Sequence, residues 1–192
     1  MDAMQTLMAA DDIHAAVSKL SQWVISDPQF NQIEPTAIAL VGIRRRGEII
    51  AQRTAEHLSR HFKRSIDVGA LDITMYRDDV MGNRPITVPM GTEMNFRLDD
   101  RVVILLDDVL QTGRSVRAAL DALVDFGRPR FIRLAVLVDR GGREYPIAAD
   151  FVGRKVDADQ QFQILVHLKP IDEEDGVYLE LARQPQKTGA AQ

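Results

Sequence analysis

Two adjacent acids and the small polar turn that follows them are the residues of this sequence best suited to chemistry. Asp107 and Asp108 end an apolar run, and the turn Thr112-Gly113-Arg114-Ser115 comes shortly after them. Backbone N–H groups at a turn that opens a helix bind anions such as phosphate. Carboxylates accept hydrogen bonds from vicinal hydroxyls or hold a hydrated Mg²⁺. The combination is typical of a ribose-5-phosphate site, and the alternative is a pair of solvated acids with an ordinary serine cap.

The sequence around this turn predicts a buried strand before it and a helix after it. Residues 102–106 form a short apolar run without alternation, which is typical of a parallel strand buried on both faces. Beyond the turn, Val116, Leu120 and Leu123 recur at helical spacing. Ligands of open α/β sheets bind at the carboxyl ends of the strands, and the two acids fall at such an end.

The same alternation of strand, turn and helix recurs along the chain and predicts an α/β domain with a parallel sheet. Apolar runs indicate further strands at 36–43, 65–73 and 131–138, and shorter ones near 151, 162–168 and 177–181. Helical spacing predicts one helix at 49–62 and an earlier one, capped by Asp11 or Asp12, with the apolar stripe Ile13, Val17, Leu20 and Val24. Strands end in polar or glycine-bearing turns at 42–47, 107–115 and 139–142, and we expect these turns to share one edge of the sheet.

Two stretches lack the pattern of a packed element. Residues 74–100 have no periodicity and contain two prolines and two glycines. A loop of this length inside a compact domain is usually a functional lid, a β-hairpin arm or a disordered segment. The polar stretch 184–192 has no apolar anchor and is expected to fray, which leaves residues 1–183 as a single domain.

The bulk composition limits the kind of protein. A chain of 192 residues with 45% hydrophobic and 27% charged residues is ordinary for one globular domain. The sequence has no cysteine, no apolar run long enough to span a bilayer and no signal-peptide pattern at its start, so we expect a cytoplasmic protein without membrane contact. Because the formal net charge is -4, any contact with nucleic acid needs a local basic face.

Four stretches of the sequence, taken in order, resemble the PyrR family of type I phosphoribosyltransferases. LLDDVLQTGRS is similar to the signature with which that superfamily binds phosphoribosyl pyrophosphate (PRPP). The resemblance covers roughly residues 11–181 and is carried by LVGIRRRGEIIAQR, LDITMYRDD, VILLDDVLQTGRSVRAALDAL and LAVLVDRGGREYPIAADFVGRKV. It implies the type I phosphoribosyltransferase fold, a parallel-sheet core flanked by helices, with a flexible loop about 74–100 and a small hood about 140–160.

The resemblance implies roles for the residues of the PRPP half of the site. Asp107 and Asp108 would hold the ribose 2- and 3-hydroxyls, and residues 110–115 would bind the 5-phosphate. The turn Arg45-Arg46, which often contains a cis peptide in this superfamily, would meet the pyrophosphate, and Arg77 would belong to the loop that closes over it. The candidate catalytic residues are Arg46, Arg77, Asp107 and Asp108, and the remaining residues of the phosphate turn are Val109, Leu110, Gln111, Thr112, Gly113, Arg114 and Ser115.

The base half of the site is expected at the third of the three turns. By resemblance, Val138, Asp139 and Arg140 would lie beside uracil, with the region of Ile147 as a hood above it. The alternative for Arg140 is a simple ion pair with Asp139 or Glu144. The chain also departs from the family here, because glycine stands at 142, where many relatives have histidine, and tyrosine at 145, where leucine is usual.

The resemblance implies an enzyme that converts uracil and PRPP to UMP and diphosphate, with Mg²⁺ bound mainly through PRPP rather than by a set of protein ligands. It also implies a regulator that responds to UMP or UTP, binds the leader mRNA of a pyrimidine (pyr) operon and forms a homodimer or a larger homo-oligomer. A salvage phosphoribosyltransferase without an RNA role and a nucleotide sensor with little turnover are the alternatives.

An RNA-binding face would have to be local. Arg53, Arg60, Lys63 and Arg64 could form a basic stripe along one predicted helix. The alternative is an exposed helix face in which Glu48 and Glu56 neutralise these charges. Because proteins recognise RNA hairpins by shape, phosphates and splayed bases, no short sequence motif is expected.

Overall fold

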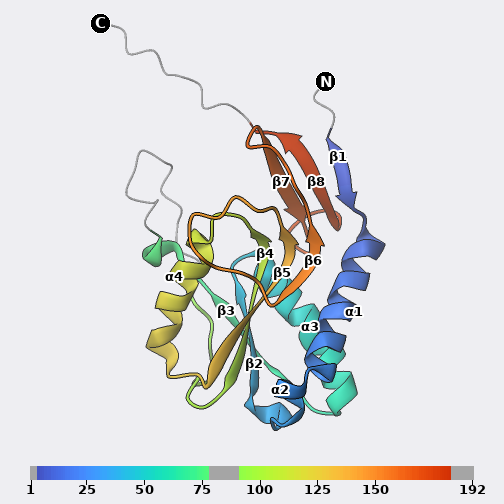
Figure 1. Ribbon diagram of the computed structural model, residues 1–192. Coiled ribbons are helices and arrows are strands. Elements are labelled where there is room, and N and C mark those ends of the chain that lie inside the picture. Colours follow the sequence, from blue (N-terminus) through green and yellow to red (C-terminus); the bar gives the residue numbers. More distant parts are fainter. Residues whose placement is uncertain (1–3, 78–90, 183–192) are drawn as a thin grey trace, which may run out of the picture.

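The core of the molecule is a five-stranded parallel sheet in the order β3-β2-β4-β5-β6 (Figure 1). The computed structural model describes residues 4–77 and 91–182. The strands of this main sheet are β2 (Ile38–Ile43), β3 (Asp67–Leu71), β4 (Val102–Leu110), β5 (Phe131–Asp139) and β6 (Phe151–Lys155). Since all five run in the same direction, the turns that follow β2, β4 and β5 meet at one edge, as the sequence predicted.

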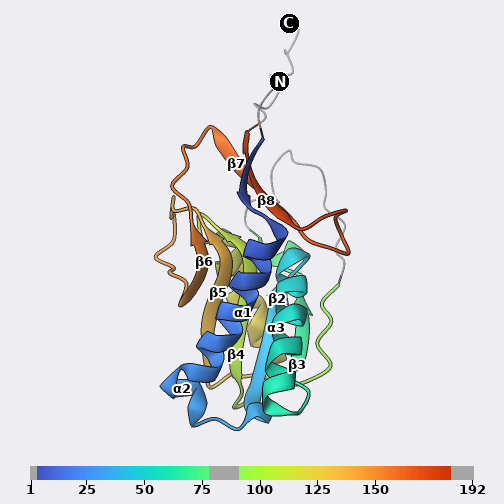
Figure 2. The ribbon, with the colours of Figure 1, turned by 90° about the vertical axis from the view of Figure 1, so that its right-hand side faces the viewer.

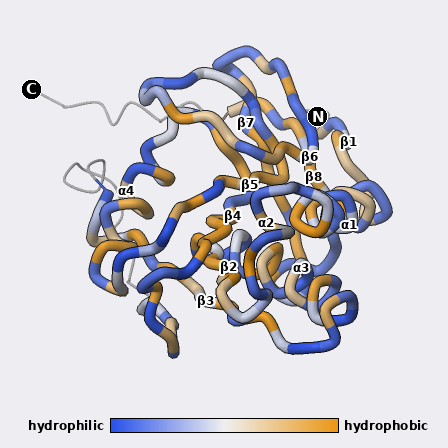
Figure 3. The backbone as a smooth tube through the Cα atoms, turned by 60° about the horizontal axis from the view of Figure 1, so that its bottom comes forward, coloured by the Kyte–Doolittle hydropathy of each residue, from blue (hydrophilic) through white to orange (hydrophobic). Residues whose placement is uncertain are grey.

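Helices cover both faces of the main sheet (Figures 1 and 2). Helices α1 (Ala10–Ser26) and α3 (Arg46–Phe62) pack on one face, and α4 (Arg114–Leu123) packs on the other. Along β4, Ile104 and Leu106 point to the first face and Val103 and Leu105 to the second, and all are buried. Figure 3 shows the central strands in hydrophobic colours and the outer loops largely in hydrophilic ones. The remaining helical pieces are α2 (Pro28–Asn31), η1 (Pro35–Ala37), η2 (Thr74–Tyr76) and η3 (Val124–Phe126).

A second, antiparallel sheet lies beyond the carboxyl edge of the main sheet (Figures 1 and 2). Its order is β1-β8-β7, with β1 at Gln5–Met8, β7 at Phe162–His167 and β8 at Gly176–Leu181. The expected bounds of the hood, about 140–160, are therefore wrong, because 151–155 forms β6 of the main sheet. Strand β1 was not predicted, since its pairing partner β8 lies at the other end of the sequence.

Several local predictions also need correction. Strand β4 continues through both acids to Leu110, because Asp107, Val109 and Leu110 pair with β5. The N-cap of α1 is Ala9, whose N–H donates to the carboxylate of Asp12 at 2.9 Å, so the acids lie in the first turn of the helix. Leu120 is exposed on α4, where the alanines of the helix fill the narrow space against the sheet instead.

The long loop is fixed at both ends where the structure describes it. The carboxylate of Asp72 accepts hydrogen bonds from the N–H groups of Thr74 and Gly91, at 2.9 and 3.0 Å, and Ala70 forms a bridge with Glu93. Residues 78–90 and the predicted tail at 184–192 lie outside the described residues. Within the described ranges, no helix is both long enough and apolar enough to cross a membrane.

Candidate active site

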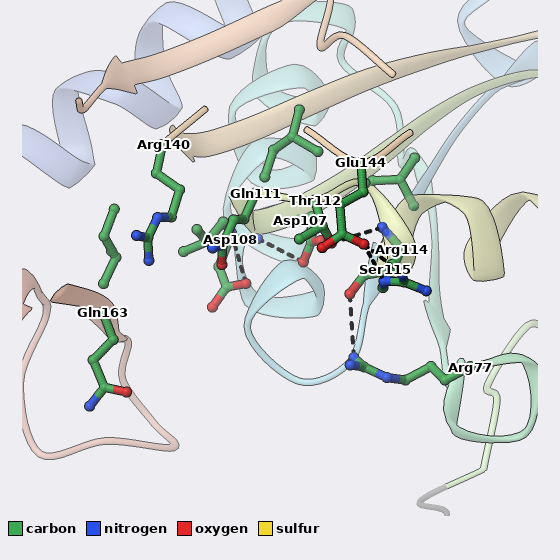
Figure 4. Close-up of a pocket in the computed structure, with 15 residues that line it drawn as sticks. Arg77, Asp107, Asp108, Gln111, Thr112, Arg114, Ser115, Arg140, Glu144 and Gln163 are labelled. Atoms are coloured by element: carbon green, nitrogen blue, oxygen red, sulfur yellow. Dashed lines mark hydrogen bonds and ion pairs between the residues drawn. The ribbon is translucent and has the colours of Figure 1, made fainter. Parts of the chain in front are cut away.

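A cavity of about 510 Å³ lies at the carboxyl edge of the main sheet and reaches the small sheet (Figure 4). It brings together most of the residues predicted for the PRPP site. The lining consists of Arg77, residues 107–116, Arg140, Glu144, Gln163 and Ile164. Because these residues come from both halves of the chain, the cavity is the strongest candidate for the active site.

The turn between β4 and α4 presents backbone N–H groups to this cavity. Gly113 is the N-cap of α4 and has a φ of 89°, a left-handed conformation that favours glycine. A Cβ on Gly113 would also lie 3.2 Å from the Cβ of Tyr145. The first N–H groups of a helix have no acceptor within the helix, so those that follow Gly113 can bind an anion. The alternative of Ser115 as an ordinary cap is wrong, since Ser115 lies in the first turn of α4.

Arg143, which the sequence did not single out, holds this turn from behind. Its Nη1 donates to the carbonyl oxygen of Gln111 at 2.9 Å, and its Nε donates to that of Ile147 at 2.8 Å. Its Nη2 contacts the carboxylate of Asp139 at 2.6 Å. A guanidinium is suited to this role because its planar donors reach several acceptors at once. Arg143 therefore ties the exit of β4 to the end of β5.

The two acids lie side by side at the mouth of the turn. The Oδ1 of Asp107 accepts the N–H of Asp108 at 2.9 Å, and the Oδ1 of Asp108 accepts the N–H of Val109 at 2.9 Å. Asp107 is 6% exposed, so the alternative of two solvated acids is wrong for this residue. Burial and the neighbouring charge of Asp108 raise the pKa of Asp107 well above its usual value, while Arg77 opposes the shift. Asp107 and Asp108 can therefore accept hydrogen bonds from hydroxyl groups, and a nearby cation would stabilise their negative charges.

Arg77 enters the cavity from the opposite side. It follows η2, and its Nη1 donates to the Oγ of Ser115 at 3.4 Å (Figure 4). The contact spans the phosphate turn, so the guanidinium stands where a bound phosphate group would need a counter-charge. The resemblance implied that Arg77 belongs to the loop that closes over the pyrophosphate, and this role stays a prediction.

The arginine turn between β2 and α3 contains a cis peptide between Arg44 and Arg45. It runs beside the acids, since a Cβ on Gly47 would lie 2.4 Å from the carbonyl oxygen of Leu106. Arg45 is exposed, whereas the guanidinium of Arg46 is held by the carboxylate of Asp172 at 2.9 and 3.1 Å. The turn thus lies at the predicted edge, but its arginines do not line the cavity itself.

Of the residues predicted for the base, only Arg140 lines the cavity. It is 9% exposed, points inward in Figure 4 and donates to a backbone carbonyl oxygen at 3.4 Å, that of Asp159. The alternative of an ion pair with Asp139 or Glu144 is wrong, because these acids pair with Arg143 and Arg114.

The other base-side candidates serve the structure around the turn. Val138 is fully buried in the core, and Ile147 packs against Gly113 of the phosphate turn. The hydrogen bonds from Arg143 and from the N–H of Gly141 hold the pKa of Asp139 below its usual value, although burial opposes them. Asp139 therefore remains charged and anchors Arg143.

Sequence reasoning missed two lining residues of the small sheet. Gln163 and Ile164 come from β7, and Gln163 lies on the same side of the cavity as Arg140 in Figure 4. Their sequence neighbourhood has no motif, and only the placement of β7 over the main sheet brings them to the site. They supply an amide and an apolar surface beside the guanidinium of Arg140.

Comparison with known proteins identifies the family. The model of the phosphoribosyl transferase domain matches residues 6–170. The bifunctional protein PyrR of Syntrophobacter fumaroxidans is 43% identical over 183 residues, which are 95% of this chain and 96% of that protein. The chain belongs to the PyrR family. A second relative, the bifunctional protein PyrR of a Roseiflexus species, is 45% identical over 90% of this chain and 93% of that protein.

Solved structures confirm the fold of this PyrR family member. A hypoxanthine phosphoribosyltransferase of Trypanosoma cruzi superposes with a TM-score of 0.70 over 94% of this chain and 92% of its own, at 14% identity. A hypoxanthine-guanine phosphoribosyltransferase of Bacillus anthracis gives a TM-score of 0.63 over 95% of this chain and 99% of its own, also at 14% identity. At such identity the likeness concerns the fold alone. The predicted family and the predicted type I phosphoribosyltransferase fold are both confirmed.

Proposed function

We propose that this PyrR family member transfers the 5-phosphoribosyl group of PRPP to uracil and releases UMP and diphosphate. The observation that carries the proposal is the cavity in which the acid pair, the phosphate turn and Arg140 converge. The two acids lie next to the phosphate turn along β4. One ribose 5-phosphate can therefore bind the acids through its hydroxyls and the turn through its phosphate. The family membership supports the same reaction.

The reaction breaks the C1–O bond to diphosphate and forms a bond from C1 to a uracil nitrogen, which loses its proton. The ribose becomes oxocarbenium-like in the transition state, as in glycoside chemistry. Asp107 and Asp108 would accept the ribose hydroxyls, and the N–H groups after Gly113 would hold the 5-phosphate. Arg77, which lines the cavity, would neutralise the departing diphosphate, and Arg46 would add its charge from the neighbouring turn while it stays paired with Asp172. No protein nucleophile is needed.

The site residues fit a role for Mg²⁺ that is shared with PRPP. Asp107, Asp108 and Glu144 border the cavity, and Glu144 is paired with Arg114. No group of three or more side chains that could hold a metal ion occurs among the described residues. Asp107 and Asp108 would hold the ion together with oxygens of PRPP, and its charge would stabilise the leaving diphosphate. The raised pKa of Asp107 agrees with an acid that gains a cation when substrate binds.

Uracil would bind between Arg140 and strand β7. The guanidinium of Arg140 has no carboxylate partner among the described residues and can donate to a uracil carbonyl. The amide nitrogen of Gln163 donates to the carboxylate of Glu180 at 3.0 Å. Its second N–H and its carbonyl oxygen match the adjacent C=O and N–H groups of the base. Ile164 offers an apolar surface for the ring. This assignment replaces Val138 and Ile147 by two residues of the small sheet.

A direct assay separates this function from salvage of another base. Purified protein with Mg²⁺, PRPP and labelled uracil should form labelled UMP, whereas hypoxanthine and guanine should not react. Asp108→Ala and Arg46→Ala should lower kcat/KM for PRPP about a hundredfold, and the exposed Glu173→Gln should not change it. Reaction of the purines without uracil, or full activity of both alanine variants, would contradict the proposal.

We also propose that the protein regulates pyrimidine gene expression by binding a leader mRNA in response to UMP or UTP in the same cavity. Family membership supports this function. Arg60 on α3 is exposed but pairs with Glu56 at 3.7 Å, as the alternative for this face expected, and Arg53 is neutralised by Asp175. Lys63 and Arg64, which follow α3, are exposed and can meet phosphates. A homodimer or larger homo-oligomer would double the basic face. The substrates and the mRNA meet in the cytoplasm, where the protein must then reside.

Filter binding with the leader RNA of the protein's own pyr operon tests the regulatory role. Affinity should rise when UMP is added and fall as salt increases, because phosphate contacts release counterions. Replacing Arg60, Lys63 and Arg64 by glutamine should weaken binding without changing uracil turnover. If UMP did not change the affinity for RNA, the protein would be a salvage enzyme without a regulatory role. If the protein bound UMP but formed none from uracil and PRPP, it would be a nucleotide sensor.

A further inference from the structure

Two bidentate ion pairs join helix α3 to the loop between β7 and β8, residues 168–175. Arg46 contacts Asp172 through two nitrogens, at 2.9 and 3.1 Å. Arg53, two turns further along the helix, contacts Asp175 in the same way, at 2.6 and 2.9 Å. All four side chains are less than a third exposed, so solvent screens these pairs only in part. We call the two pairs the α3 clamp.

The acids of the α3 clamp are themselves fixed by their own loop. The N–H of Leu168 donates to Asp172 at 2.7 Å, and the N–H of Lys169 donates to Asp175 at 2.8 Å. Arg53 also donates to the carbonyl oxygen of Lys169 at 2.9 Å. Each carboxylate therefore connects the helix to the backbone at the end of β7, rather than to a flexible side chain.

The placement of β7 depends on such contacts, because the small sheet shares no strand with the main sheet. Apolar residues such as Val166 and Leu168 pack into the common core, but apolar packing is not directional. Bidentate pairs between guanidinium and carboxylate groups have a defined geometry. The α3 clamp thus sets how far β7, with Gln163 and Ile164, stands from the acids on β4.

We propose that Asp172 and Asp175 are positioning residues that, through Arg46 and Arg53, hold the base-side wall of the cavity at the distance that a pyrimidine ring requires. The inference rests on the proposed transfer to uracil. It assigns a function to a loop that neither touches the cavity nor belongs to the predicted site. It also explains why Arg53 is turned toward the small sheet and away from solvent.

The Arg53–Asp175 pair gives the cleaner test, because Arg46 belongs to the proposed diphosphate site. Asp175→Asn and Arg53→Gln should each raise KM for uracil about tenfold, since small misplacements of a positioning group have large effects. KM for PRPP and kcat should stay within about twofold of wild type, because Arg53 and Asp175 belong neither to the phosphate turn nor to the contacts by which Arg143 supports it. The double variant should be little worse than either single one, because each single variant already breaks the ion pair between Arg53 and Asp175.

Glu173→Gln is the matched control, since it removes the same charge from the same loop. Glu173 is exposed and makes no ion pair with the described residues. The control should keep the wild-type KM for uracil. A wild-type KM for uracil in both Asp175→Asn and Arg53→Gln would overturn the proposal. An equal rise in both KM values, or a lowered thermal midpoint with unchanged KM, would reveal a merely structural pair and would overturn it as well.

Hydrogen exchange provides a readout that does not depend on turnover. In Asp175→Asn, amides of residues 162–169 should exchange faster than in wild type, while those of 102–110 should not. If the wild-type protein made no UMP, the proposed function would fail, and the exchange data would still decide whether the clamp holds β7. Unchanged exchange in 162–169 would refute the clamp even in a fully active enzyme.

Discussion

Arg143 offers the sharpest single perturbation, because one side chain supports the phosphate turn through several contacts. Arg143→Gln removes the hydrogen bonds to the carbonyl oxygens of Gln111 and Ile147 and the ion pair with Asp139. These three contacts measure 2.9, 2.8 and 2.6 Å, and the two charged side chains are 24% and 16% exposed. They are therefore well formed and shielded from solvent.

The size of the effect follows from these contacts. Each hydrogen bond contributes a net 0.5–1.5 kcal/mol in typical cases, so their joint loss costs about 3 kcal/mol. For a domain of this size each kcal/mol corresponds to about 2–4 °C, so Tm should fall by roughly 6–12 °C. Since the exit of β4 loses its support, KM for PRPP should also rise about tenfold, with a smaller change of kcat.

Calorimetric unfolding and initial-rate kinetics measure the two consequences on the same sample. Arg128→Gln is the control, because Arg128 is exposed and its side chain makes no ion pair with the described residues. That variant should unfold within about 1 °C of wild type, as surface substitutions usually do. If Arg143→Gln matched Arg128→Gln in both Tm and KM for PRPP, the assigned role of Arg143 would be refuted.

Three further predictions follow from the described contacts. Asp107→Asn should lower turnover at least a hundredfold yet raise Tm at pH 8 by about 2–4 °C. A carboxylate with a raised pKa in the fold loses stability as pH rises, so this gain in Tm should shrink as the pH is lowered toward 4. Gly47→Ala should lower Tm by roughly 2–12 °C, because its Cβ would meet the carbonyl oxygen of Leu106 at 2.4 Å. Asp175→Asn should lower Tm at pH 7, because Arg53 lowers the pKa of Asp175 and the charged carboxylate therefore stabilises the fold. This Tm difference should shrink as the pH falls below about 4 and through the lowered pKa, and a Tm difference that did not change between pH 7 and the acid range would contradict this origin.

The parts that could be predicted from the sequence are those set by local patterns. The apolar run before Asp107 and Asp108 and the glycine turn after them predict a strand, an anion site and a helix from neighbouring residues. Parallel strands then bring the three polar turns to one edge without further information. The resemblance to the PyrR family added the expected role of Arg77, which no local pattern shows.

The parts that could not be predicted depend on long-range packing. Gln163 and Ile164 reach the cavity only because β7 pairs with β8, and β8 pairs with β1 from the start of the chain. Arg46 and Asp172, 126 residues apart, meet through the same arrangement. Leu120 has helical spacing but faces solvent, because the space beneath α4 is filled by alanines. No short stretch of the sequence contains a pattern that predicts these contacts or the exposure of Leu120.

The most direct test of the proposed function is a ³¹P NMR experiment on the purified chain with Mg²⁺ and PRPP. Addition of uracil should convert the PRPP signals to those of UMP and diphosphate in equal amounts, and addition of hypoxanthine should leave PRPP intact. The same sample carrying Asp107→Asn and Asp108→Asn should show no conversion. PRPP that stayed intact with uracil, or that was consumed equally well by the double variant, would contradict the assignment of this cavity as a uracil phosphoribosyltransferase site.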